Sequence, residues 1–437
     1  MANGYEVPAT ERPVERTPRD ERTGRFLVLL EQEEMAAGLR ALEEGAGVAG
    51  VEHVTGGDAG DTGVLAHQGS LVFDDLGVAV ITVDPEQQVA LESTVASTSG
   101  LAIEPERAVY ACTVTTDYLR GYRDGMAAGI GLTIDEEALT HESAAHVVQI
   151  QDGPASTWGV RAVLASEATQ LGHGVGIAVL DTGVAANHAD LSGRVRSTRS
   201  FVPGEEVEDG HGHGTHCCGT VCGGSAGANA YRYGVAPGVD LYAGKVLNNR
   251  GRGTDTEILF GIEWAMNEKD VRVISLSLTR AIPPGQGYSP HYERAAQRAM
   301  QKGTLIVAAA GNYSTRPGYT APVSSPANCP TIVAVGAVDP YLGIADFSCG
   351  GQHPNGGEVS LVGPGVNVYS AWRDGGYKRL DGTSMATPHV AGVAALMWEQ
   401  RPEATVAEIK SALRANARVL PLSSADAGAG LAQVPLG

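Results

Sequence analysis

The sequence predicts an α/β fold with a mainly parallel sheet, preceded by a smaller α+β module. From residue 157 onward, short apolar runs alternate with longer helical stretches. These runs lack the strict alternation of half-exposed strands, as expected of strands that are buried on both faces of a parallel sheet. Residues 25–115 instead show the order strand, helix, strand, strand, helix, strand. That order is typical of a compact split βαβ module.

The larger part is expected to alternate strands with helices. Its apolar runs lie at residues 176–180, 241–247, 273–278, 305–310, 332–338 and 359–362. Its helical stretches lie at residues 216–222, 255–267, 292–302, 384–400 and 405–417. In such sheets the functional site lies at the carboxyl ends of the strands. The residues that follow each apolar run are therefore the first candidates for a site.

The rest of the chain is expected to contain a lead-in, the smaller module and a linker. In the smaller module, strands are expected at residues 26–30, 48–54, 78–83 and 109–114, and helices at 33–44 and 86–91. Residues 1–24 are rich in Glu, Arg, Pro and Thr and are expected to be a disordered lead-in. Residues 116–156 are polar with clustered glycines and are expected to be a linker. The larger domain would then occupy residues 157–437.

The acidic composition bears on partners and location. The formal net charge is -19 and the sequence pI is near 5.0. Nucleic acids and anionic membranes attract basic surfaces, so we expect neither as a partner. No segment reaches the roughly 18–20 apolar residues that span a bilayer, and residues 1–25 lack the apolar core of a signal peptide. We therefore expect a cytoplasmic protein, with export by another route as the alternative.

The six cysteines show no zinc-binding spacing. Cys218 and Cys222 lie four residues apart on an expected helix and so share a face, where they are expected to be buried as small apolar side chains. Cys329 and Cys349 flank an expected strand and could pair under oxidising conditions. The sequence leaves their redox state open.

Three polar residues stand at expected strand ends or helix starts. Asp181 follows an apolar run, His213 precedes a helix of small residues, and Ser384 opens a strongly apolar helix. A serine hydroxyl becomes an effective nucleophile beside a base that a third group orients. Each residue also has an ordinary alternative: Asp181 as a turn former, His213 as a metal ligand, and Ser384 as a helix cap.

A fourth segment supplies a hydrogen-bond donor. An expected buried strand runs into Gly311 and ends at Asn312, whose side-chain amide suits the oxyanion that forms during acyl transfer. The four segments occur in one order, as Val-Leu-Asp181-Thr-Gly, His213-Gly-Thr-His, Ala-Ala-Gly-Asn312 and Gly-Thr-Ser384-Met-Ala-Thr-Pro-His. Together they resemble the signatures of the subtilisin family of serine peptidases, over residues 157–420. The resemblance implies a doubly wound α/β fold around a parallel seven-stranded sheet.

The resemblance also assigns roles within the site. Ser384 would attack the scissile carbonyl, His213 would take and return its proton, and Asp181 would orient His213. Asn312 and the Ser384 backbone N–H would bind the oxyanion. His211 lies outside the motif and is expected to be solvated, with a His211/His213 metal pair as the alternative.

The family holds a polypeptide substrate as an extended strand between two backbone segments. The candidate substrate-binding residues that match are Gly251, Arg252, Gly253, Ser277, Leu278, Thr279, Ala309 and Gly311. The family often has two glycines where this chain has Thr279 and Arg280, which changes the shape and charge expected of the pocket.

By resemblance no cofactor is required, and a structural calcium ion is a candidate at Asp190. The companion loop at residues 223–230 offers only Asn229 as an obvious oxygen ligand, whereas calcium takes about six to eight oxygens. Cys217 follows the histidine motif, and proteinase K-like relatives carry a cysteine there beneath the base. Mercury or thiol reagents are therefore expected to inhibit the enzyme by displacing His213.

The module at residues 25–115 resembles the propeptide of subtilisin-type enzymes in its element order, which is ferredoxin-like, and in its place. A propeptide would assist folding, inhibit the enzyme, and be cut between about residues 112 and 157. The alternative is a binding module unrelated to activation. For the whole chain we expect a self-processing serine endopeptidase. A silent peptide-binding protein and a transpeptidase or cyclase in peptide tailoring remain open alternatives.

Overall fold

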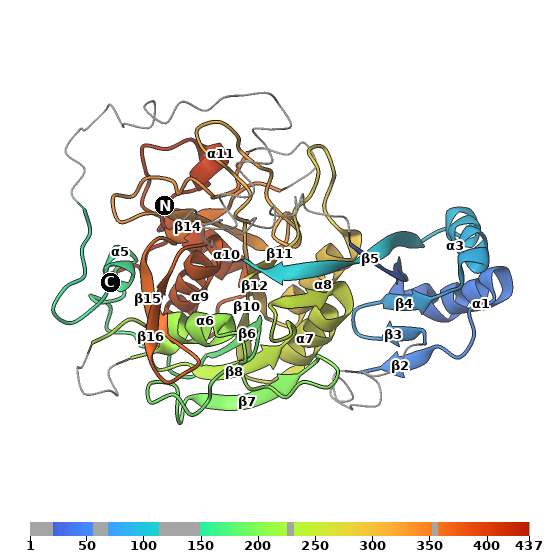
Figure 1. Cartoon of the computed structure of the whole chain (residues 1–437), viewed down its shortest axis with the longest axis horizontal. Helices are drawn as coiled ribbons and strands as arrows, with labels where there is room; N and C mark the ends of the chain where they lie inside the picture. Colours follow the sequence, from blue (N-terminus) through green and yellow to red (C-terminus); the bar gives the residue numbers. More distant parts are fainter. Residues whose placement is uncertain (1–20, 56–68, 113–148, 225–230, 352–356, 437) are drawn as a thin grey trace, which may run out of the picture.

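The computed structural model describes residues 21–55, 69–112, 149–224, 231–351 and 357–436. The predicted lead-in falls mostly on residues 1–20 and the predicted linker mostly on residues 116–148, which lie outside these ranges. Strand β1 (Arg22–Leu29) begins inside the predicted lead-in. Figure 1 shows a large α/β body with a smaller lobe at its side.

The smaller lobe is a mostly antiparallel sheet with two helices. After β1 its elements are η1 (Gln32–Glu34), α1 (Met35–Ala46), β2 (Glu52–Val54), β3 (Leu71–Phe73), β4 (Val78–Thr82), α3 (Pro85–Ser97) and β5 (Ala102–Ala111). The strands lie in the order β5-β1-β4-β3-β2, in which β2 and β3 form a parallel pair. The predicted order is present with one additional three-residue strand, β3.

Strand alternation gives this sheet two apolar faces. Val28 and Ile81 pack with the buried residues of α1 and α3. Leu27 and Val80 point the other way and belong to the core of the larger domain. Because successive strand residues face opposite sides of a sheet, one short sheet holds its own helices and also docks on the larger domain.

The larger domain is built on a parallel sheet of seven strands in the order β14-β13-β12-β10-β6-β8-β7. The strands are β6 (Gly176–Asp181), β7 (Val195–Ser200), β8 (Asp240–Lys245), β10 (Val271–Leu276), β12 (Leu305–Ala309), β13 (Val333–Val338) and β14 (Leu361–Pro364). The central strands β6, β12 and β13 are buried at every position. They therefore read as continuous apolar runs rather than alternating ones.

Helices cover both faces of this sheet (Figure 1). On one face α6 (His213–Cys222) packs against α9 (Thr383–Gln400), and on the other α7 (Asp255–Asn267) packs against α8 (Pro290–Gln301). The remaining elements are α5 (Trp158–Ala162), β9 (Arg252–Thr254), β11 (Leu278–Thr279), β15 (Val368–Ala371), β16 (Tyr377–Leu380), α10 (Val406–Ala415) and α11 (Ser424–Ala427). The doubly wound fold that the sequence predicts is confirmed.

Strand β5 joins the two parts. It leaves the smaller lobe and runs into the larger domain (Figure 1), where it pairs antiparallel with β9 on one edge and with β11 on the other. The interface also stacks Phe73 edge-on against Phe260, with ring centroids 4.7 Å apart. Ion pairs Arg294–Glu31 at 2.8 Å and Lys302–Asp75 at 2.7 Å border it.

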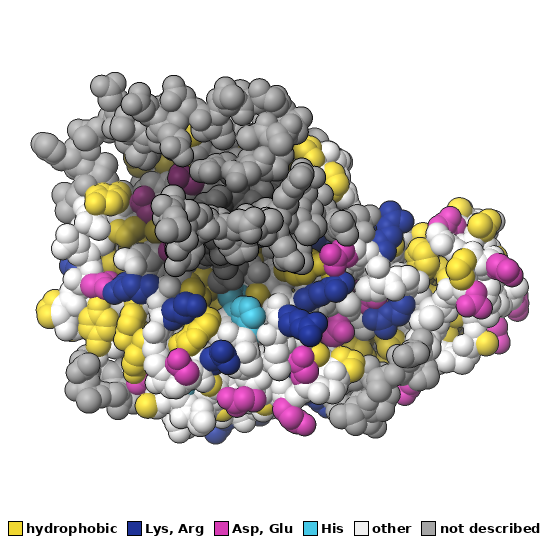
Figure 2. All heavy atoms as spheres, viewed as in Figure 1, with side chains coloured by type: hydrophobic (Ala, Val, Ile, Leu, Met, Phe, Trp, Pro, Cys, Tyr) yellow, Lys and Arg dark blue, Asp and Glu magenta, His cyan; other side chains and the backbone are white. Residues whose placement is uncertain are grey.

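No helix in the described ranges has both the length and the hydrophobicity for a bilayer crossing. Figure 2 shows acidic and basic side chains interspersed over the described part of the face in view.

Candidate active site

Asp181 and His213 meet beneath the carboxyl end of the parallel sheet. Asp181 ends β6 and His213 opens α6, and both side chains are fully buried. The Asp181 Oδ1 lies 2.7 Å from His213 Nδ1 and also accepts the backbone N–H of Thr182 at 2.7 Å. Since Nδ1 is engaged with a carboxylate, it carries the proton, and Nε2 is left as the basic nitrogen.

A second carboxylate, Asp209, holds the start of α6. Its Oδ1 accepts the backbone N–H of Gly212 at 2.7 Å and the hydroxyl of Thr182 at 2.8 Å. Its Oδ2 accepts the N–H and the hydroxyl of Thr215 at 2.8 and 2.7 Å. Asp209 thereby caps the helix that carries His213. Sequence reasoning missed it, although an Asp just before a Gly-rich helix start is a capping signal.

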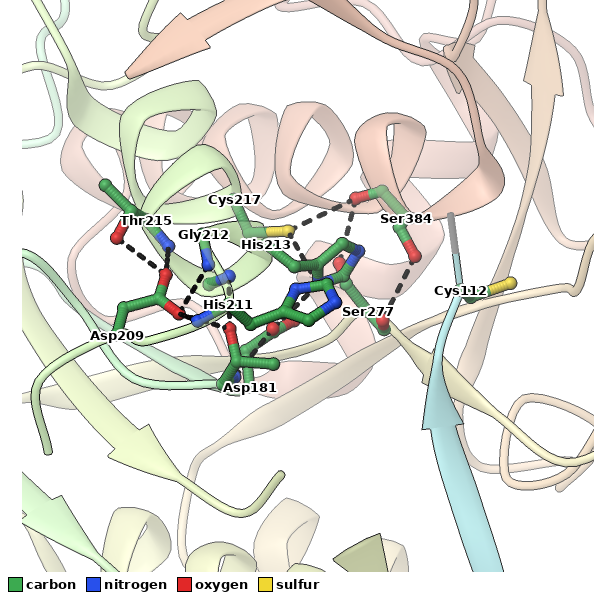
Figure 3. Close-up of polar contacts among 12 residues, drawn as sticks. Cys112, Asp181, Asp209, His211, Gly212, His213, Thr215, Cys217, Ser277 and Ser384 are labelled. Atoms are coloured by element: carbon green, nitrogen blue, oxygen red, sulfur yellow. Dashed lines mark hydrogen bonds and ion pairs between the residues drawn. The ribbon is translucent and has the colours of Figure 1, made fainter. Parts of the chain in front are cut away.

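Ser384 lies in the first turn of α9 and is fully buried. Its hydroxyl donates to the carbonyl of Ser277 at 3.0 Å. The Nε2 of His213 is buried without a hydrogen-bond partner among the described residues. Figure 3 shows Asp181 and Ser384 on opposite sides of the histidine side chains. In this arrangement the Ser384 hydroxyl is bonded to Ser277 rather than to His213.

Asn312 is oriented as a donor by its own contacts. Its Oδ1 accepts the backbone N–H of Thr383 at 2.9 Å and the Thr383 hydroxyl at 2.8 Å. This fixes the amide orientation, so that Nδ2 is free to donate, and it donates to the carbonyl oxygen of Cys112 at 2.8 Å. At the start of α9 the Thr383 N–H is bound by Asn312 and the Met385 N–H by the Gly382 carbonyl at 3.0 Å.

The predicted substrate-binding segments flank β5 and Cys112. Residues Arg252 and Gly253 of β9 pair with one edge of β5, and Leu278 and Thr279 of β11 pair with the other edge. Beyond the paired residues, the Ala111 N–H donates to the Gly251 carbonyl at 2.8 Å and the Cys112 N–H to the Ser277 carbonyl at 3.3 Å. The chain itself thus occupies the cleft as an extended strand.

Two other predicted substrate-binding residues lie deeper. Ala309 is buried within β12, opposite Val335. Gly311 donates its N–H to the Thr383 hydroxyl at 3.1 Å. A Cβ on Gly311 would lie 2.3 Å from the Ser324 hydroxyl. Both residues therefore support the loop that carries Asn312.

The neighbouring histidines are not spare catalytic bases. His216 is fully buried, its Nε2 contacts two backbone carbonyls at 3.1 Å, and burial lowers its pKa to about 3, so it stays neutral. His211 is half-buried beside His213, which corrects the expectation of a solvated side chain. Burial and the neighbouring His213 lower the pKa of His211.

Cys217 lies under the histidine. Its Sγ is 4.0 Å from His213 Nδ1 and 3.7 Å from the Ser384 carbonyl oxygen (Figure 3). Asp181, His213 and Cys217 are also the one cluster of three potential metal ligands in the described ranges. However, burial raises the pKa of the Cys217 thiol well above its usual value, and the charge of Asp181 adds to the rise. Cys217 is therefore held in its protonated form beside the Asp181–His213 pair.

The Asp190 carboxylate accepts hydrogen bonds from two tyrosine hydroxyl groups. Its Oδ2 accepts hydrogen bonds from Tyr233 at 2.7 Å and Tyr377 at 2.8 Å, while its buried Oδ1 has no partner among the described residues. Asp190 joins no cluster of three ligand side chains in the described ranges. A calcium site needs about six to eight oxygens. The described residues around Asp190 therefore fit a tyrosine-clamped carboxylate better than a calcium site; the companion loop falls mostly on residues 225–230, outside the description.

All six cysteines are buried and unpaired in the structure. Cys222 Sγ lies 3.5 Å from the Cys218 carbonyl on the shared face of α6. Cys329 and Cys349, whose pairing the sequence left open, are free thiols here.

Comparison with known proteins agrees with this geometry. The model of the subtilase family matches residues 172–431. Subtilisin DY of Bacillus licheniformis is 40% identical over 247 residues, covering 56% of this chain and 84% of that protein. Subtilisin BL of Lederbergia lenta is 41% identical over 267 residues, covering 60% and 91%. Subtilisin Savinase of the same species is 40% identical over the same length and coverage.

These relatives correct one expectation from the sequence. The predicted cytoplasmic location is wrong, because the subtilisins that the chain matches are secreted extracellular enzymes. The segment on which that expectation depended, residues 1–20, lies outside the described ranges.

The comparisons extend to the class of chemistry. Subtilisins hydrolyse polypeptides, need no cofactor, and commonly bind structural calcium. The matched region contains the parallel sheet together with Asp181, His213, Asn312 and Ser384. The chain therefore belongs to the subtilase family and is a serine endopeptidase of the subtilisin type.

Proposed function

We propose that the enzyme cuts peptide bonds with a triad of Asp181, His213 and Ser384, and that it is made as a zymogen that cuts itself. The observation that carries the proposal is the carbonyl of Cys112 on the Asn312 amide, at the end of a strand held in the cleft. A peptide carbonyl in this place stands where a substrate carbonyl would react.

The chemistry follows from the contacts. The Ser384 hydroxyl passes its proton to His213 Nε2 as its oxygen attacks the carbonyl carbon. Asp181 holds the other ring nitrogen and stabilises the imidazolium that forms. The oxyanion is bound by Asn312 Nδ2 and the backbone N–H of Ser384. His213 then returns the proton to the leaving amine, and water resolves the ester by the reverse sequence.

Substrate is proposed to bind as β5 does, by adding a strand between β9 and β11. Main-chain hydrogen bonds such as Ala111 N–H to the Gly251 carbonyl provide affinity that does not depend on sequence. This arrangement suits an endopeptidase, because it engages backbone on both edges of the strand and no chain terminus.

The smaller lobe is proposed to be an inhibitory propeptide. It contributes β5 to the cleft, and its sheet is buried against α7 and α8 of the catalytic domain. An intact lobe therefore blocks access to Ser384. Residues 25–115 would form this lobe and residues 157–437 the catalytic domain, with residues 116–156 between them.

The test compares purified wild type with Ser384→Ala. Wild type should shorten itself and then hydrolyse an unfolded protein such as casein, whereas Ser384→Ala should stay full length and inactive. Ser424→Ala, an exposed serine at the start of α11, is the matched control and should behave as wild type. An active wild type that never shortens would refute self-processing, and an active Ser384→Ala would refute the triad.

A further inference from the structure

The backbone of Cys112 is held on three sides. Its N–H donates to the Ser277 carbonyl at 3.3 Å, and its carbonyl oxygen accepts from Asn312 at 2.8 Å. A Cβ on Gly382 would lie 2.7 Å from the same carbonyl oxygen, so that oxygen sits closely against the turn before Ser384. No other peptide carbonyl of the smaller lobe is placed on the Asn312 amide among the described contacts.

The side chain of Cys112 lies in a confined space. It is buried, and its Sγ is 3.6 Å from the Thr383 hydroxyl. Burial raises the pKa of the thiol, and hydrogen bonds from the side chains of Thr279, Thr383 and Ser384 oppose the rise. The thiol therefore lies among hydroxyl groups.

Thr279, on β11, forms one wall of this space. It pairs with Tyr110, two residues before Cys112, so it lies diagonally across from Cys112 on the same face of the ladder. Its side chain is fully buried, and its hydroxyl lies 3.2 Å from the Tyr313 hydroxyl. Because its position is fixed from both sides, it leaves room for a small side chain at Cys112.

On these grounds, and resting on the proposed function, we propose that the chain cuts itself at the peptide bond between Cys112 and Thr113, and that Thr279 restricts the residue before the cut to small side chains. The same restriction applies to substrates that later take the place of β5.

In this step the Ser384 oxygen bonds to the Cys112 carbonyl carbon and its proton moves to His213. The bond from that carbon to the Thr113 nitrogen then breaks, and His213 protonates the nitrogen as it leaves. Water, deprotonated by His213, cleaves the Ser384 ester and leaves a carboxylate on Cys112. The products are residues 1–112 and residues 113–437. The second product, which carries the catalytic domain, keeps residues 113–156 at its amino terminus.

The location of the cut is tested by intact-mass measurement and amino-terminal sequencing of purified, self-processed wild type. The expected products end at Cys112 and begin at Thr113. A first cut at any other bond between residues 113 and 157 would overturn the inference while leaving self-processing intact. A wild type that stays intact, like Ser384→Ala, would instead overturn the proposed function beneath it.

The restriction is tested by varying both partners in the full chain and following the rate of self-cleavage. Cys112→Ala should cut at the same bond, and Cys112→Phe should slow by roughly ten- to hundredfold, the scale expected for overpacking a buried site. Val89→Phe is the matched control, because Val89 is 72% exposed in the same lobe. It should not slow the cut.

The decisive variant is Cys112→Phe combined with Thr279→Gly. Removing the threonine side chain should recover most of the lost rate, while the backbone pairing of β11 with β5 is kept. Far-ultraviolet circular dichroism of each variant in a Ser384→Ala background shows that it is folded. If folded Cys112→Phe cuts as fast as wild type, or if Thr279→Gly recovers nothing, the assigned role of Thr279 is wrong.

Discussion

The side-chain amide of Asn312 donates a 2.8 Å hydrogen bond to the carbonyl oxygen of Cys112, a residue 200 positions earlier in the chain. This contact links the end of β12 in the catalytic domain to the end of β5 in the smaller lobe. The proposed oxyanion donor is thus engaged by the strand that lies between β9 and β11.

Replacing Asn312 should reduce turnover without weakening substrate binding. Asn312→Ala loses an oxyanion donor and is expected to lower kcat by roughly 10²–10³-fold with KM nearly unchanged. Asn312→Asp keeps an oxygen for the Thr383 N–H but loses the donor, and should show a similar loss. Steady-state kinetics on a peptide ester and amide measure both. Asn416→Ala, an exposed amide at the end of α10, is the control. Wild-type kcat in either Asn312 variant would remove Asn312 from the mechanism.

Mercury should inactivate the mature enzyme through Cys217. A metal on its sulfur, 4.0 Å from His213 Nδ1, would displace the imidazole. Burial raises the pKa of the Cys217 thiol well above its usual value, so alkylating reagents that need a thiolate should react slowly. Activity titrated with mercuric chloride should fall in wild type and in Cys218→Ala but persist in Cys217→Ala. Equal inhibition of all three would place the sensitive thiol elsewhere.

Rising pH should destabilise the folded chain through Glu263. This α7 residue is fully buried, and neither carboxylate oxygen has a hydrogen-bond partner among the described residues. Burial, reinforced by the charge of Asp75 on the smaller lobe, raises its pKa to about 8, while Lys302 opposes the rise. The folded chain therefore prefers the protonated carboxyl, and its stability falls as pH climbs from the ordinary carboxyl range through 8.

The measurement is the unfolding free energy of full-length Ser384→Ala, with and without Glu263→Gln, from pH 5 to pH 9. As pH rises, the unfolding free energy of the glutamine variant should increase relative to that of its parent, by an amount on the order of a few kcal/mol. Glu403→Gln, an exposed carboxyl, should run parallel to the parent at every pH. If the unfolding free energies of Glu263→Gln and its parent also differed by the same amount at every pH, Glu263 would not be a buried acid in the folded chain.

Asp190 should depend on tyrosine hydroxyl groups rather than on calcium. Tyr233→Phe or Tyr377→Phe removes one donor from a buried carboxylate, with an expected cost of about 1–3 kcal/mol. Tyr369→Phe is the matched control, because Tyr369 stacks on Tyr377 through its ring. The difference in unfolding temperature between calcium and chelator should then be the same in wild type and in Asp190→Asn. A calcium effect that vanishes in Asp190→Asn would make Asp190 a ligand after all.

The sequence located the elements of the site because their signals are local. The run before Asp181 is buried on both faces of the sheet, and the residues after it form a turn. The same short segment therefore predicts both the end of the strand and the carboxylate. The same holds for the loop ending in Asn312 and for the apolar helix after Ser384. Parallel topology then places all three at one edge of the sheet.

What the sequence did not show depends on contacts between distant residues. The sequence predicts a strand at residues 109–114, and the resemblance places the end of the smaller module in the cleft. No motif singles out Cys112 as the residue on Asn312, since its partners lie far away in sequence, at Ser277 and Asn312. The strand β3 spans three residues, Leu71–Phe73, too few for a periodic signal. Helix α6 begins at His213, three residues before its predicted start, because Asp209 caps a Gly-rich segment that has little helical propensity of its own.

The most direct test of the triad is labelling of the self-processed enzyme with a fluorophosphonate, followed by peptide mapping of the modified residue. The label should sit on Ser384 in processed wild type and in processed His211→Ala, because His211 touches neither Asp181 nor the nucleophile in the described contacts. His213→Ala should stay full length and take no label. A label on another serine, or an undiminished label on Ser384 in His213→Ala, would contradict the mechanism.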